Sequence, residues 1–207
     1  MPVSRKENKE VTRGHGLLET YLSKKRGEVA DRLIPPSARD GRLLDIGCGT
    51  YPLFLMNVDF REKVGLDKVS GKDRITMTCP DNVNVIDFDI ETDQDLPFEA
   101  DSFDAVSMLA VFEHIEPAKL VDVVKGIHRV LKPGGLFVMT TPASWTGGLL
   151  RWMARAGLVS REEIEEHKDT YSPGKIFGIL RKGNFPGGML RYGYFEMFAN
   201  IWITATK

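Results

Sequence analysis

The chain contains the sequence Leu43-Leu44-Asp45-Ile46-Gly47-Cys48-Gly49-Thr50, in which an apolar run passes directly into a turn with two glycines. Short apolar runs that end in turn residues are typical of buried strands in a parallel sheet. Gly47 and Gly49 can adopt backbone conformations that side chains would block, and they let the main chain approach a ligand closely. The sequence therefore predicts a buried strand followed by a ligand-binding turn.

The next apolar run, residues 63–66, leads to an acid, Asp67, twenty positions after Gly47 (67 minus 47). An acid at this place, at the end of a second strand, is suited to accept hydrogen bonds from both hydroxyls of a ribose. A dinucleotide-binding turn would carry a third glycine at position 52, where this chain has Pro52. These features favour an adenosine-containing ligand and argue against a nicotinamide dinucleotide.

Three more apolar runs have the length of buried strands and are bounded by turn or helix-capping residues. They lie at residues 83–88, 104–109 and 136–141. Between the second and the third run, residues 120–131 carry apolar side chains at helical spacing until Pro133-Gly134-Gly135 ends the pattern. This alternation predicts a crossover helix that connects two parallel strands.

The two ends of the chain complete the predicted fold. Residues 16–33 have a loosely helical apolar period, and a helix capped by Ser172 and Pro173 is expected to run to Gly183. Two aromatic-rich runs near the C-terminus predict an antiparallel strand pair at the sheet edge. We therefore predict an α/β, three-layer, Rossmann-like fold with a doubly wound, mostly parallel seven-stranded sheet and an antiparallel C-terminal strand.

Composition limits the functions and locations of the chain. It has 207 residues, with 28 Lys and Arg against 29 Asp and Glu and a formal net charge of −1, which disfavours binding to nucleic acid. The polar N-terminus and the lack of a long apolar stretch argue against secretion and stable membrane insertion. Cys48 and Cys79 are too few for a disulfide framework or a four-cysteine metal site. We expect a cytoplasmic monomer or homodimer.

A series of motifs follows the first strand in a fixed order. The motifs are Leu44-Asp45-Ile46-Gly47-Cys48-Gly49-Thr50, Gly65-Leu66-Asp67, Asp89-Ile90-Glu91, Leu96-Pro97-Phe98, Ser102-Phe103-Asp104 and Arg129-Val130-Leu131-Lys132-Pro133-Gly134-Gly135. In this combination, over about residues 43–142, the chain resembles the class I S-adenosylmethionine-dependent methyltransferases, specifically the type 11-like group that acts on small molecules. We expect a single methyltransferase domain over residues 1–207, with a helical N-terminal segment at 1–40 and a substrate lid inserted at 143–171.

The resemblance implies S-adenosylmethionine as the cofactor and S-adenosylhomocysteine as its product. The glycine turn would surround the methionine part, an acid in the first strand would favour the ammonium, and acids after the second and third strands would hold the ribose and the adenine. Backbone carbonyls after the fourth strand would lie near the methionine ammonium. The cofactor-binding residues expected on this basis are Asp45, Gly47, Cys48, Gly49, Thr50, Tyr51, Asp67, Lys68, Asp89, Ile90, Leu109 and Ala110.

Tyr51 departs from the family pattern, because a third glycine is common at its position. Two roles are open for it: Tyr51 either closes over the cofactor or packs under the helix that follows. Cys48 is expected to be a small residue of the turn and no nucleophile.

Methyl transfer is an in-line displacement at carbon, so the protein must supply proximity, alignment and, for a hydroxyl acceptor, a base. The candidate catalytic residues are His114, after the fourth strand, and His167, before Tyr171. The alternative for His114 is a packing role beside the cofactor. Its Glu113-His114 segment is similar to that of ubiquinone-type O-methyltransferases, some of which carry a metal there. Because Ala110 replaces an acid expected in such sites, no metal is predicted.

The acceptor is expected to be a small molecule, methylated at oxygen or nitrogen. Residues 109–112 lack the Asn/Asp-Pro-Pro-aromatic turn of enzymes that methylate adenine or glutamine. Residues 145–164 mix large apolar side chains with Arg151 and Arg155, which suits a lid over an apolar cavity or a helix that lies on a membrane and collects a lipid. Two other functions are considered: a catalytically silent methyltransferase-like subunit with a binding or regulatory role, and aminopropyl transfer.

Overall fold

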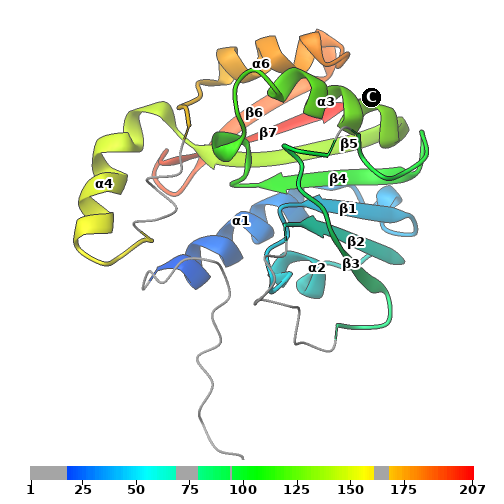
Figure 1. Cartoon of the computed structure of the whole chain (residues 1–207), viewed down its shortest axis with the longest axis horizontal. Coiled ribbons are helices and arrows are strands. Elements are labelled where there is room, and N and C mark those ends of the chain that lie inside the picture. The colour runs from blue at the N-terminus through cyan, green and yellow to red at the C-terminus, as the bar shows by residue number, and fades with distance from the viewer. Residues whose placement is uncertain (1–17, 69–78, 94, 161–167) are drawn as a thin grey trace, which may run out of the picture.

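The structure of the chain is a computed structural model that describes residues 18–68, 79–93, 95–160 and 168–207. One seven-stranded sheet has the order β3-β2-β1-β4-β5-β7-β6 (Figure 1). Strand β7 pairs antiparallel with both of its neighbours, and every other pair of neighbours is parallel. The predicted sheet is confirmed. The strands are β1 (Arg42–Ile46), β2 (Glu62–Asp67), β3 (Val83–Asp87), β4 (Phe103–Leu109), β5 (Leu131–Pro142), β6 (Leu190–Phe195) and β7 (Asn200–Thr206).

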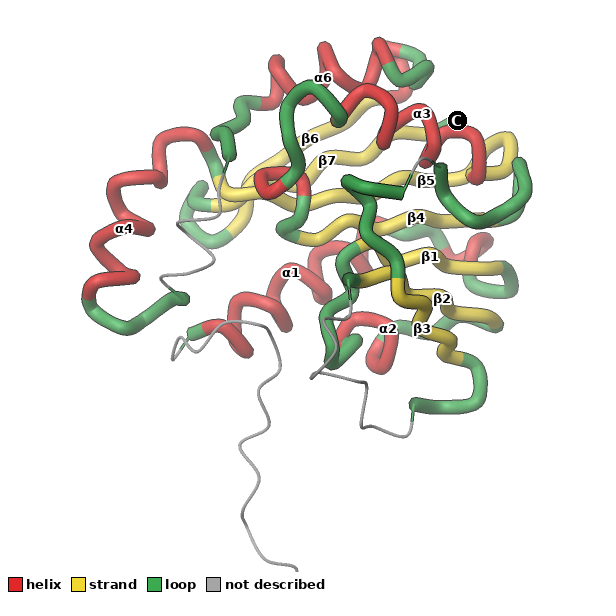
Figure 2. Tube along the Cα trace, viewed as in Figure 1, coloured by secondary structure: helices red, strands yellow, loops and turns green. Residues whose placement is uncertain are grey.

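Helices cover both faces of the sheet, which gives the predicted three layers (Figure 2). Leu44 and Ile46 of β1 pack with α3 and α6, whereas Leu43, which points to the opposite face, packs with α1 and α2. This alternation follows from the period of two in a strand, and both faces of β1 are apolar because both are buried. The helices described are α1 (Glu19–Leu33), α2 (Leu53–Asn57), α3 (Leu120–Val130), α4 (Gly147–Arg155) and α6 (Pro173–Lys182).

The predicted signals for the ends of α1 and α6 act as expected. Helix α1 ends at Leu33, directly before Ile34 and the Pro35-Pro36 pair. At the start of α6, the Ser172 hydroxyl accepts a hydrogen bond from the backbone N–H of Lys175 at 3.4 Å, and Pro173 occupies the first helical position, where no N–H is needed. None of the described helices is long and apolar enough to cross a membrane.

One predicted boundary is wrong. The strand expected at residues 136–141 begins earlier, at Leu131, directly after α3. Pro133-Gly134-Gly135 forms an irregularity inside β5, since Phe103 pairs with Leu131 but Ala105 pairs with Leu136. Gly134 takes a left-handed φ of 79°, which lets the strand absorb the extra residues and resume its pairing.

Candidate active site

A cavity of about 1480 Å³ lies where β1, β2 and β4 end. Helices α1 and α4 and the β6–β7 turn, residues 196–199, also contribute to its walls. This is the edge of a doubly wound sheet where ligands bind, because the connections leave a crevice outside the carboxyl ends of the middle strands. Every predicted cofactor residue lines this cavity except Thr50, which lies in the same turn.

The glycine turn after β1 has the conformation that the sequence predicts. Gly47 and Gly49 have φ values of 76° and 75°, and a Cβ atom on Gly47 would lie 2.2 Å from Cγ2 of Val111. The Gly49 N–H donates to Oδ2 of Asp67 at 2.7 Å, so the turn is folded back on the end of β2. Burial raises the pKa of the neighbouring Cys48 thiol, which makes it a poor nucleophile. A main chain held this way can closely surround a ligand.

Asp45 lies inside the protein at the foot of this turn. Its side chain is 3% exposed, and its Oδ1 accepts a hydrogen bond from the Ser107 hydroxyl at 2.6 Å. Burial raises the pKa of Asp45 to about 7, the Ser107 hydrogen bond opposes the shift, and the charge of Asp67 adds to it. A positive ligand group beside Asp45 would restore the ionised carboxylate, which fits a cationic cofactor such as S-adenosylmethionine.

Asp89 and Lys68 form an ion pair at the adenine end that the sequence predicts. Lys68 Nζ lies 2.7 Å from Oδ2 of Asp89, and the Glu91 N–H donates to Oδ1 at 2.9 Å. The Lys68 hydrogen bond is the main cause that lowers the pKa of Asp89, so its carboxylate is ionised near neutral pH. An adenine amino group would therefore share Asp89 with Lys68.

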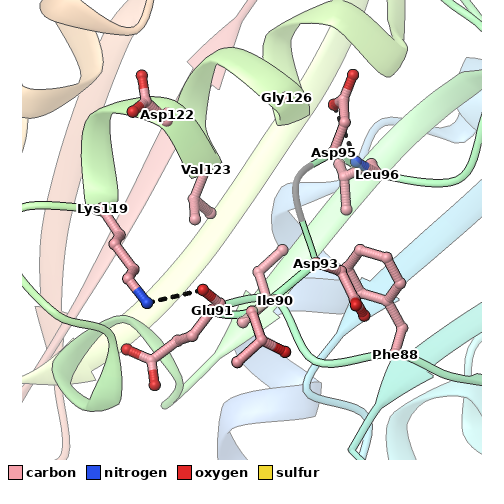
Figure 3. A pocket seen from close by; sticks show the side chains of 11 residues that line it. Phe88, Ile90, Glu91, Asp93, Asp95, Leu96, Lys119, Asp122, Val123 and Gly126 are labelled. Carbon is pink, nitrogen blue, oxygen red and sulfur yellow. Dashed lines mark hydrogen bonds between the residues drawn. The ribbon is translucent and has the colours of Figure 1, made fainter.

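A smaller pocket of about 230 Å³ lies behind this end of the cavity (Figure 3). Phe88, Ile90 and Glu91 line both spaces, and α3 closes the smaller one through Lys119, whose Nζ donates to the Glu91 carbonyl at 2.8 Å. Apart from Ile90, which lines both spaces, none of the predicted site residues in the described part of the chain lines the smaller pocket, so this pocket only backs the loop after β3.

The chain turns sharply into the cavity after β4. Ala110 has a left-handed φ of 56°, and its N–H donates to the Thr140 carbonyl at 2.9 Å. A left-handed conformation costs a residue with a side chain about 1 kcal/mol or more, and such strain concentrates at functional sites. The turn brings Leu109, Ala110 and Val111 to the cavity wall beside Gly47.

His114 and Glu113 both reach the cavity from the short 3-10 helix Phe112–His114. Glu113 is 2% exposed, and its carbonyl accepts a hydrogen bond from the Lys168 N–H at 2.9 Å. Phe112 packs edge to face against Tyr171, with ring centroids 5.0 Å apart. The structure thus brings His114 into one cavity with the predicted cofactor residues, whereas His167 lies outside the described residues.

The lining residues that were not predicted from the sequence include Arg26 of α1, and Glu196 and Asn200 at the β6–β7 turn. Asn200 Nδ2 donates to Oε2 of Glu196 at 2.5 Å. Burial raises the pKa of Glu196, and the positive charge of Arg26 opposes the shift. Glu196, Met197 and Phe198 have consecutive φ values of 49°, 53° and 67°. The only sequence signal was the short spacing between the two aromatic runs, because no glycine marks this left-handed turn.

Known proteins share both the sequence pattern and the architecture. A family model described as a methyltransferase domain matches residues 18–185. An uncharacterised methyltransferase of Synechocystis is 32% identical over 108 residues, 47% of this chain and 49% of that protein. The ubiquinone biosynthesis O-methyltransferase of Roseobacter denitrificans is 27% identical over 172 residues, 75% of this chain and 64% of that protein. The chain therefore spans about half to two thirds of the length of these relatives.

Solved structures share the fold. The crystal structure of an S-adenosylmethionine-dependent methyltransferase from Mesorhizobium loti matches with a TM-score of 0.64 and 19% identity, over 90% of this chain and 100% of that one. At this identity the likeness concerns the fold alone. Because the family model covers most of the chain, this chain belongs to the methyltransferase domain family, with the fold of the class I S-adenosylmethionine-dependent methyltransferases.

Proposed function

We propose that this chain transfers the methyl group of S-adenosylmethionine to an oxygen or nitrogen atom of a small-molecule acceptor. One observation carries the proposal: the predicted cofactor residues and a largely apolar wall from α1, α4 and the β6–β7 turn share a single cavity. Its volume of about 1480 Å³ exceeds the roughly 300–1,000 Å³ typical of pockets for one drug-sized ligand. The cavity therefore has room for a cofactor and an acceptor side by side, which is what methyl transfer requires.

The bound cofactor supplies an electrophilic methyl group on a positively charged sulfur. The residues of this chain bind and orient it: Asp45 balances the charge of its ammonium, and Asp67 accepts from its ribose. Ile90 packs on the adenine, whose amino group lies toward Asp89. The three aspartates favour a positively charged ligand in a site that is partly shielded from water.

The acceptor end of the cavity combines apolar walls with a few polar groups. Leu149, Leu150 and Met153 of α4 supply apolar surface, while Arg26 and Glu196 supply charge. Within the described part of the chain, Oε1 of Glu196 is buried without a hydrogen-bond partner. An acceptor with an apolar body and one hydroxyl or amino group that donates to Glu196 would satisfy this end.

A hydroxyl acceptor must lose its proton as the methyl group arrives. We assign this step to His114, because it lines the cavity just after the strand end that the cofactor residues occupy. His167 stays the second candidate, from sequence alone. Glu113 lines the same cavity, and its carboxylate is a further candidate to act on the acceptor or to position the imidazole.

The proposal extends to the domain organisation and the setting. Residues 143–171 act as a lid over the acceptor, since α4 supplies a wall of the cavity. We infer a single domain over residues 1–207 that works as a cytoplasmic monomer or homodimer, without a nucleic-acid partner. The name of the Roseobacter relative, an O-methyltransferase of ubiquinone biosynthesis, supports a small acceptor methylated at oxygen.

The decisive test is product formation by the full chain. The purified protein is incubated with S-adenosylmethionine and a library of phenols, catechols and amines, and both S-adenosylhomocysteine and methylated products are measured by mass spectrometry. We expect S-adenosylhomocysteine to accumulate only with certain acceptors, each gaining one methyl group. Tight cofactor binding without turnover on any acceptor would instead favour the catalytically silent subunit, and a product carrying an aminopropyl group would favour aminopropyl transfer.

A further inference from the structure

An exposed apolar surface borders the mouth of the cavity. It consists of Trp145, Leu149, Trp152, Met197 and Phe198, here called the apolar rim. Trp152 is 61% exposed and Met197 is 92% exposed, although both are large apolar side chains. Single exposed apolar residues are normal on a protein surface, but a contiguous group of them marks a surface that contacts a partner.

The rim is a built structure that joins two separate elements. The Trp145 Nε1–H donates to the Phe198 carbonyl at 3.1 Å, which ties the segment before α4 to the β6–β7 turn. Met197 and Phe198 have a strained left-handed backbone conformation, and their apolar side chains are nevertheless exposed to water. Figure 1 shows α4 standing away from the sheet, at the end where β6 joins β7. Apolar side chains that a strained backbone holds in water indicate an interaction surface.

The charged side chains of α4 favour an anionic partner. Helix α4 presents Leu149 and Trp152 to solvent, and its charged side chains are Arg151 and Arg155, both exposed. Residues 143–160 contain these two arginines and no Asp or Glu. Apolar and aromatic side chains flanked by basic ones are typical of a helix that lies in the interface of an anionic membrane. A surface with exposed tryptophan suits this depth, because the indole ring is apolar with a polar N–H.

The rim is continuous with the cavity. Leu149 and Met197 belong to both, and Leu150 and Met153 continue the apolar surface of α4 inward. Contact between the rim and a membrane would therefore turn the cavity mouth toward the lipid. Association with a second copy of the chain would close the mouth instead.

We propose that the apolar rim docks the protein on an anionic membrane surface, with α4 in the interface and the cavity mouth toward the lipid. The docking does not depend on methyl transfer. If the proposed function holds as well, acceptors with a long apolar portion can enter the cavity directly from the membrane.

The test uses the full chain and two kinds of vesicle, one of phosphatidylcholine mixed with phosphatidylglycerol and one of phosphatidylcholine alone. We expect co-flotation with the mixed vesicles and a blue shift of tryptophan fluorescence. Trp152→Ser should weaken binding about tenfold, because the indole no longer leaves water. The double variant Arg151→Gln/Arg155→Gln should weaken binding to the mixed vesicles by about tenfold or more and remove the preference for them.

Matched controls lie at the other end of β6. Met189→Ser, which replaces an exposed methionine before β6, is the control for Met197→Ser, which replaces an exposed methionine after β6. Arg181→Gln/Lys182→Gln, which removes two exposed charges at the end of α6, is the control for Arg151→Gln/Arg155→Gln. Only the variants of the rim and of Arg151 and Arg155 should lose vesicle binding. Equal losses in both sets, or no binding to mixed vesicles, would overturn the proposal, and so would a dimer that Met197→Ser dissociates. S-adenosylhomocysteine binding is also measured without vesicles. A protein that binds this ligand but no vesicles would contradict the docking proposal and leave the proposed function standing.

Discussion

The hydroxyl of Ser107 donates a hydrogen bond to Asp45 at 2.6 Å, and the two residues face each other as register partners on β4 and β1. The bond joins these two neighbouring strands just before the glycine turn begins. Because Asp45 is buried, its carboxylate is poorly solvated, and burial raises its pKa from the ordinary value of 3.8 to about 7. The cavity therefore contains an acid that titrates near neutral pH.

We expect this acid to make the protein more stable at low pH. Between pH 4 and pH 7 the unfolded chain has an ionised Asp45 and the folded one a protonated Asp45, so the free energy of unfolding falls as pH rises toward 7. The loss is up to about 4 kcal/mol for a shift of this size. Asp45→Asn should remove it, as measured by urea unfolding at pH 5 and pH 8. Equal pH dependence in both proteins would show that Asp45 is not responsible.

Binding of S-adenosylhomocysteine should release a proton below pH 7, because the ligand ammonium favours ionised Asp45. Calorimetric titration at pH 6 in two buffers of different ionisation enthalpy measures this release. We expect the wild type to release a proton and Asp45→Asn to release none, with weaker binding.

As a control for the ligand class, S-adenosylhomocysteine at 100 times its Kd should stabilise the fold by about 2.7 kcal/mol. A rise in Tm with NADH alone would contradict the assigned cofactor.

Gly47→Ala should abolish cofactor binding. A Cβ atom there meets the Val111 side chain at 2.2 Å and is strained by the left-handed backbone. We expect at least a hundredfold loss of affinity for S-adenosylhomocysteine in calorimetry. Gly148→Ala is the matched control, because a Cβ atom on Gly148, in α4, meets nothing within 4 Å. Wild-type affinity in Gly47→Ala would show that the turn tolerates a side chain and does not hold the ligand.

Asp67→Ala and Asp89→Ala should each weaken cofactor binding by about 1 to 3 kcal/mol. We expect Asp67→Ala to have the larger effect, because Asp67 also holds the Gly49 N–H and the shape of the turn. Asp122→Ala is a control, since that carboxylate is 80% exposed on α3 and lies outside the larger cavity. Calorimetric titration of the three variants with S-adenosylhomocysteine measures these effects. Unchanged affinity in both Asp67→Ala and Asp89→Ala would remove these acids from the site.

His114→Ala should lower turnover of a hydroxyl acceptor by about 100 to 10,000-fold without changing cofactor affinity. The pH–rate profile of His114→Ala should lack the low-pH limb, because that limb reports protonation of an imidazole base. Profiles of His114→Ala, His167→Ala and Glu113→Gln on one identified acceptor distinguish the candidates. Normal turnover with the limb intact in His114→Ala would assign the proton to another group, whereas lost stability alone would indicate a packing role.

Much of the fold followed from local pattern. Residues 43–50 combine an apolar run with two glycines, and short-range sterics alone make that a strand and a turn. The same holds for α6, where Ser172, Pro173 and Gly183 mark the ends through groups within one turn of the helix. Pro133-Gly134-Gly135 misled the prediction, because pairing with β4 continues around the break and only the partner strand shows this.

That the predicted cofactor residues share one cavity was predictable, since parallel strands bring their carboxyl ends to the same edge of a sheet. The end of the cavity that we propose for the acceptor was not predictable. Arg26, Glu196 and Asn200 come from opposite ends of the chain and have no common spacing, so only the packing of α1 against the sheet and the insertion of β7 between β5 and β6 bring them into one cavity. The apolar rim likewise depends on which side chains of α4 and the β6–β7 turn remain uncovered, and burial of that kind is a property of the whole packed chain.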